Sequence, residues 1–140
     1  MSLFEGQKVT EVVTATDIKR LTGITPDDFQ FQDGDPSEKL DELLHEWIEG
    51  IASHVHVRLG RTVKQDEEGY LAIKDIIVRT VAKVVAVAQQ QRSSPIIQTG
   101  DFVVSVLNTA EVTNDIKKEL RPFLRKSRIN VFSSAEPFKG

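Results

Sequence analysis

The chain has 140 residues, of which 39% are hydrophobic and 28% charged, and its net charge is −3. This composition is typical of a folded protein and excludes an intrinsically disordered one. No apolar run approaches the roughly 20 residues of a membrane-spanning helix, and the first residues lack the features of a signal peptide. The absence of cysteine excludes disulfides and thiolate zinc sites. We expect a single intracellular domain over residues 1–132 and a flexible tail over 133–140.

The charge is unevenly distributed along the chain. Residues 1–70 hold 7 Lys and Arg against 15 Asp and Glu, a balance of −8, whereas residues 71–140 hold 11 against 6, a balance of +5. A solvated surface without a binding role is the commoner cause of such asymmetry. The alternative is that copies of the chain pack head-to-tail, with the acidic part of one against the basic part of the next.

Short elements are expected in the first third of the chain. Residues 1–13 show little periodicity, and Val9, Val12 and Val13 are expected to form a short extended arm. Thr14 or Thr16 is expected to cap a short helix over residues 17–22. The segment 24–34 is rich in Pro, Asp and Gly and predicts a connecting loop.

The strongest signal of regular structure lies between residues 35 and 60. Asp35 is expected to cap a helix, Pro36 suits its first position, and Glu38 is placed to complete a capping box. Gly60 is expected to end this helix. Its apolar residues recur at spacings of three and four, which places them on one face. They are Leu40, Leu43, Leu44, Trp47, Ile48, Ile51, Val55 and Leu59.

A second long helix is expected from Tyr70 to about Gln91, because apolar residues again repeat at spacings of three and four. They extend over more than one side of the helix, so other elements should cover more than one side. The short link of residues 61–69 makes the two long helices antiparallel neighbours. Trp47 is expected to anchor the core between them.

The segment after the second long helix predicts a β-hairpin. Residues 96–98 and 101–107 are rich in β-branched side chains and flank Thr99-Gly100, which favours two strands around a tight turn. Such a hairpin would either cap the helical core or offer a free edge to another chain.

A further helix is expected after the hairpin, capped by Asn108 or Thr113 and ended or kinked by Pro122. Residues 129–132 are expected to be extended. The predicted fold class is therefore mainly α: a small helical bundle built on two long antiparallel helices, with a short β-hairpin and a C-terminal helix.

No constellation of reactive side chains stands out. His54 and His56 are two residues apart, which on a helix directs their imidazoles differently, whereas zinc-binding helical pairs are four apart. His45 lies at helical spacings from acidic residues, but a solvated polar face explains this more simply. The serines have no base nearby, and the glycines form no phosphate-binding pattern. We therefore expect no enzyme, no catalytic residue, no cofactor and no metal site.

The best candidate for a binding segment is a basic run near the end of the chain. Its candidate residues are Lys117, Lys118, Arg121, Phe123, Leu124, Arg125, Lys126 and Arg128. Such a run is a solvated helix face, a site for an acidic protein surface, or a site for a nucleic-acid backbone. The mildly acidic chain and the lack of a recognition helix argue against sequence-specific DNA binding. Because Pro122 interrupts the helix, Phe123 and Leu124 are expected to be free to reach outward.

Five parts follow one another in an order that is itself informative. They are a short helix at residues 16–21, a capped helix ending in Leu59-Gly60-Arg61, a second apolar helix, the segment Gly100–Val106, and the ending Leu120–Lys126. This order resembles that of the head–tail connector proteins of tailed double-stranded-DNA bacteriophages, also called adaptor or head-completion proteins. The similarity spans about residues 14–131. The leucine–arginine–proline–aromatic–basic ending is its most specific part, with Phe123 where the family often has tyrosine.

The resemblance implies a small helical bundle that forms a ring, twelvefold when docked, beneath the portal at the head–tail junction of the virion. The ring would extend the DNA channel without sequence-specific binding and carry a tail-side stopper or tail-completion protein. In that family the C-terminal segment reaches the portal, which here would be about Val112 to Arg128. We expect a chain made in the host cytoplasm and monomeric in isolation.

Two alternatives remain at this point. The first is another neck or tail-completion protein of the same structural class. The second, from a different class, is a small helical nucleic-acid-binding regulator that uses the same basic run.

Overall fold

The computed structural model of the chain describes residues 2–29, 31, 34–91 and 94–124, and this part contains α-helices and 3-10 helices but no β-strand. The α-helices are α1 (Val9–Val12), α2 (Ala15–Thr22), α3 (Pro36–Leu59), α4 (Tyr70–Gln90), α5 (Asp101–Leu107) and α6 (Ala110–Leu120). The 3-10 helices are η1 (Pro26–Asp28), η2 (Pro95–Gln98) and η3 (Arg121–Phe123). The mainly helical class is confirmed. The predicted extended segment 129–132 and the tail 133–140 lie outside the described residues.

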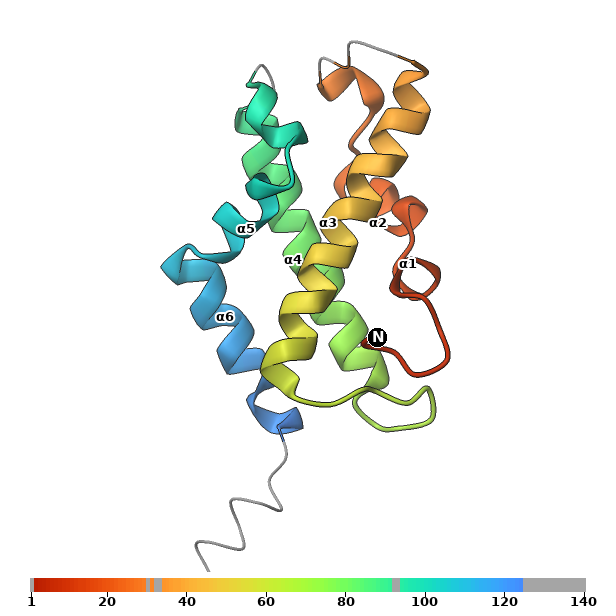
Figure 1. The fold of residues 1–140 in the computed structure, drawn as a ribbon, viewed down its shortest axis with the longest axis vertical. Helices are drawn as coiled ribbons and strands as arrows, with labels where there is room; N and C mark the ends of the chain where they lie inside the picture. The colour runs from red at the N-terminus through yellow and green to blue at the C-terminus, as the bar shows by residue number, and fades with distance from the viewer. Residues whose placement is uncertain (1, 30, 32–33, 92–93, 125–140) are drawn as a thin grey trace, which may run out of the picture.

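Two long helices, α3 and α4, form the centre of the molecule. They run in opposite directions and cross, with α1 and α2 on one side of the pair and α5 and α6 on the other (Figure 1). The predicted apolar stripe of α3 is buried along its whole length, from Leu40 to Leu59. Gly60 ends α3 with a φ of 76°, a left-handed conformation that glycine adopts without strain. The periodicity of the sequence therefore predicted this helix pair correctly.

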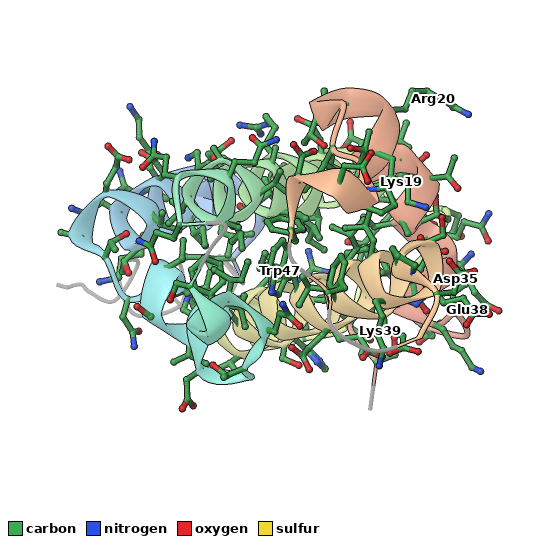
Figure 2. The ribbon with its side chains drawn as sticks, turned by 90° about the horizontal axis from the view of Figure 1, so that it is seen from above. Lys19, Arg20, Asp35, Glu38, Lys39 and Trp47 are labelled. Carbon is green, nitrogen blue, oxygen red and sulfur yellow. The ribbon has the colours of Figure 1, made fainter. Side chains whose placement is uncertain are left out.

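Trp47 lies in the interior of the bundle and is fully buried, as expected (Figure 2). Its ring packs edge-on against Phe29, with centroids 6.3 Å apart, and at a tilt against Phe102, with centroids 5.7 Å apart. Phe29 follows η1 and Phe102 belongs to α5. Trp47 therefore joins elements from both sides of the molecule to α3.

The predicted β-hairpin is wrong, because its two halves form η2 and α5. Phe102, Val103, Val106 and Leu107 are buried, whereas Val104 is 52% exposed. Residues 102, 103, 106 and 107 share one side of a helix, and that side faces the core. Burial of these side chains outweighs the β propensity of the three valines. The free strand edge that the hairpin would have offered is absent with it.

Two smaller expectations also need correction, and a third is confirmed. The extended arm at residues 9–13 is wrong, because its first four residues form α1, which places Val12 in the core. The cap of α6 is Thr109, whose hydroxyl accepts the N–H of Val112 at 3.5 Å, and neither Asn108 nor Thr113 has that role. The ending of α6 at Pro122 is confirmed, since the chain tightens there into η3.

The N-terminal segment fixes the link between α3 and α4. The N–H of Glu5 donates to the carbonyl of Val63 at 2.9 Å, and the N–H of Val63 donates to the carbonyl of Leu3 at 2.8 Å. Phe4 is fully buried and packs edge-on against Tyr70 at the start of α4, with centroids 5.3 Å apart. These contacts hold the link in place. Gly69, at the end of the link, in turn contacts the ring of Phe123 in η3. None of the helices described is long and apolar enough to cross a bilayer.

Candidate partner-binding surface

Helix α6 directs two of its three acidic residues towards α4. Asp115 and Glu119 are one turn apart and face α4, where Lys83 contacts Asp115 at 2.7 Å and Arg79 contacts Glu119. The hydrogen bond from Lys83 lowers the pKa of the Asp115 carboxyl. Both acids of this side are therefore neutralised within the molecule.

The basic residues of α6 and η3 face solvent instead. Lys117, Lys118 and Arg121 are exposed, and none of them forms an ion pair within the part of the chain that the structure describes. Their charge is available to an external partner. This segment contains both acidic and basic residues, but its outer surface is mainly basic, because two of its three acids are paired with bases of α4.

A depression lies where the C-terminal ends of α3 and α6 meet. It has a volume of about 240 Å³ and is lined by Arg58, Lys117, Leu120, Arg121 and Leu124, and we call it the basic depression. Leu120 is buried beneath it. Three cations around an apolar floor suit a carboxylate-bearing surface, because arginine offers paired donors to carboxylates and the floor accommodates their aliphatic stems.

Phe123 and Leu124 are not free to reach outward, and that expectation is wrong. Both are partly buried and pack against the core. Arg61 donates from Nη2 to the carbonyl of Phe123 at 3.2 Å and from Nη1 to Glu67 at 2.8 Å. A Cβ at Gly69 would lie 2.8 Å from Cδ1 of Phe123, so the aromatic ring packs directly on a glycine. The ring therefore fixes η3 to the link between α3 and α4.

The five predicted binding residues that the structure describes thus fall into three groups. Lys117 and Arg121 line the basic depression together with Leu124, Lys118 is exposed but does not line it, and Phe123 is held against the link. Arg125, Lys126 and Arg128 lie outside the described residues. For all eight residues, a role in binding a partner remains a prediction.

Sequence reasoning missed the contribution of α3 to this surface. The binding segment predicted from the sequence does not include Arg58. It lies 59 residues before Lys117, and no local pattern links two such positions. Only the packing of α6 beside the end of α3 brings them together.

His54 supports the position of Arg58. The Nε–H of Arg58 donates to Nε2 of His54 at 2.9 Å, which requires that nitrogen to be unprotonated. Partial burial, and then the positive charge of Arg58, lower the pKa of His54 from its ordinary 6.5. The neutral imidazole is therefore the form that the folded chain favours.

This arrangement predicts a pH dependence of stability. Because the pKa of His54 is lower in the folded than in the unfolded chain, its stabilising contribution is complete above about pH 6.5 and is lost as the pH falls from there towards the folded pKa. Denaturant titrations of the wild type and His54→Gln across this range should show a smaller loss of stability on acidification in the variant. Parallel pH profiles of the two proteins would contradict the assignment.

Within the described part of the chain, no three histidine, aspartate or glutamate side chains come together as the ligands of a metal ion would. Comparison with protein-family models, with curated proteins and with solved structures finds no match to this chain. The function is therefore argued from the sequence pattern and from the surface described above.

Proposed function

We propose that this chain is a head–tail connector protein of a tailed bacteriophage. It would form a ring beneath the portal, extend the DNA channel, and dock on the portal through the basic segment from Lys117 to Arg128. The order of its parts along the sequence and its small helical bundle support this proposal. The segment Gly100–Val106 supports it only by its position, because that segment is a helix and not an exposed strand.

The observation that carries the proposal is the outward basic surface of α6 and η3. Two of the three acids of α6, Asp115 and Glu119, are paired with Lys83 and Arg79 on α4, and the third, Glu111, is exposed at the start of the helix, away from the basic depression. An outward basic surface attracts an acidic partner and repels a basic one. It therefore determines which face of the chain contacts the partner. The chain leaves the described part at Leu124, beside the basic depression, and its sequence continues with three further bases within four residues.

Charge reversal of those three later bases tests the docking role. We expect the variant Arg125→Glu, Lys126→Glu and Arg128→Glu to lose attachment to its portal by at least tenfold, because like charges then face each other. Its thermal midpoint should stay close to that of the wild type. Attachment is measured by co-sedimentation of the chain with assembled portal rings, and the midpoint by circular dichroism.

A matched control separates docking from net charge. The variant Lys8→Glu, Arg20→Glu and Lys64→Glu has the same net charge and changes exposed bases elsewhere. It is expected to attach normally. Equal attachment by both variants and the wild type would refute the docking role, and unfolding of the first variant would assign its bases to the structure of the bundle.

A nucleic-acid-binding regulator is the second candidate, because the same outward bases suit a phosphate backbone. The packing of Phe123 against Gly69 counts against it, since that ring is not free to stack on a base. DNA binding by the isolated chain, with an affinity that falls steeply as salt is raised, would favour the regulator. Attachment to portal rings without such binding would favour the connector.

A further inference from the structure

A row of acidic side chains follows the outer face of α3. Glu38, Glu42, Glu46 and Glu49 are spaced four, four and three residues apart, which places them on one side of the helix. All four are exposed, and in the described part of the chain none of them forms an ion pair. Figure 2 shows Glu38 directed outward at the start of the helix. We call these four residues the acidic row.

The acidic row and the basic depression lie on opposite sides of α3. Glu42 and Arg58 belong to the same helix and are 16 residues apart. At 100° and 1.5 Å per residue, they are separated by about 160° around the helix axis and about 24 Å along it. The two surfaces therefore face in nearly opposite directions and lie towards opposite ends of α3.

We propose that the acidic row of one copy docks on the basic depression of the next copy. The charges are complementary, and among the residues that the structure describes neither surface forms an ion pair. Because the two surfaces face opposite ways, a single two-fold contact cannot use both of them. Each copy must instead bind two different neighbours, and such a head-to-tail contact generates a closed ring or an open filament.

The biological role of this contact rests on the proposed function, since a ring is what a connector forms. Within such a ring Lys117 and Arg121 would contact the neighbouring copy, and the bases that follow Leu124 in the sequence would remain for the portal. The contact itself is expected to be weak in free solution, because exposed ion pairs contribute about 0–1 kcal/mol each and are screened by salt. A portal that holds several copies side by side would raise their effective concentration and favour the ring. This agrees with the expectation of a monomer in isolation.

Cross-linking through introduced cysteines tests the contact, and the chain has no native cysteine to interfere. A Glu46→Cys, Lys117→Cys double variant retains most charges of both surfaces. Treated with a short bis-maleimide in concentrated, low-salt solution, it is expected to give a ladder of dimers, trimers and larger species. The ladder should disappear at high salt. A product that stops at the dimer would overturn the proposal, and so would the absence of any product.

Control variants exclude random collision as the source of the ladder. Each single-cysteine variant alone is expected to stay mostly uncross-linked, whereas an equimolar mixture of the two should give a dimer that contains one of each. A double variant with cysteines at Arg20 and Leu71, which are exposed and lie outside both surfaces, should give no ladder. A ladder of equal yield from this control would overturn the proposal.

Charge exchange provides a second test that does not depend on cross-linking. The first double variant combines Glu42→Lys with Glu46→Lys, and the second combines Lys117→Glu with Arg121→Glu. Each is expected to abolish the self-association that sedimentation detects at low salt. An equimolar mixture of the two variants should restore it, because every contact in an alternating assembly again joins opposite charges. A mixture that stays monomeric would contradict the assignment.

Failure of this contact is distinguishable from failure of the proposed function. A wild-type chain that attaches to portal rings while the double-cysteine variant gives no ladder would reject the two surfaces and leave the connector function intact. A ladder without portal attachment would support the contact and reject the connector function.

Discussion

Replacing Trp47 with alanine is expected to lower the free energy of unfolding by about 3–5 kcal/mol, the range for truncating a buried large aromatic side chain. The indole is fully buried on α3 and packs against Phe29 and Phe102. Its loss would leave a cavity between elements from both sides of the bundle, and these elements cannot all close onto it. Denaturant titration measures the change.

Two variants make the Trp47 test specific. Trp47→Phe keeps an aromatic ring at the position and should cost clearly less than Trp47→Ala. Val57→Ala removes an apolar side chain from the same helix, but Val57 is 83% exposed, so the stability should change by less than about 0.5 kcal/mol. A loss below roughly 1 kcal/mol for Trp47→Ala would show that the stripe of α3 is not the main core.

Gly69→Ala is the second substitution with a large expected effect. The backbone of Gly69 has φ −80° and ψ −3°, which alanine adopts without strain, so the backbone conformation itself does not require glycine. The added Cβ would instead lie 2.8 Å from Cδ1 of Phe123, too close for any normal contact. Displacing the ring is expected to cost about 1–3 kcal/mol, as overpacking of a close contact does.

A double-mutant cycle isolates this contact. In a Phe123→Ala background, Gly69→Ala should be nearly neutral, because the ring that it would strike is absent. Equal costs of Gly69→Ala in the two backgrounds would show that the glycine serves some other purpose. Phe123 lies within the proposed docking segment and fixes it to the link between α3 and α4. Gly69→Ala should therefore also weaken portal attachment, and so should Arg61→Ala.

The sequence by itself determined the central helix pair. The apolar residues repeat at helical spacing over about five turns in α3 and about four turns in α4. Asp35 and Gly60 mark the two ends of α3. These signals are local and agree with one another, so no distant contact was needed to specify the helices. The burial of Trp47 and the ending of α6 at Pro122 followed from the same kind of local evidence.

Only the tertiary structure decided the state of α5 and the shape of the candidate site. Helix α5 has only seven residues and is rich in valine, so its local preference favours a strand. Burial of Phe102 and Leu107 against the bundle outweighs this preference. The basic depression joins Arg58 to Lys117 and Arg121, and Phe123 is held by Arg61 and Gly69. Each of these contacts joins residues more than 50 positions apart, and such pairs come together only when the helices pack.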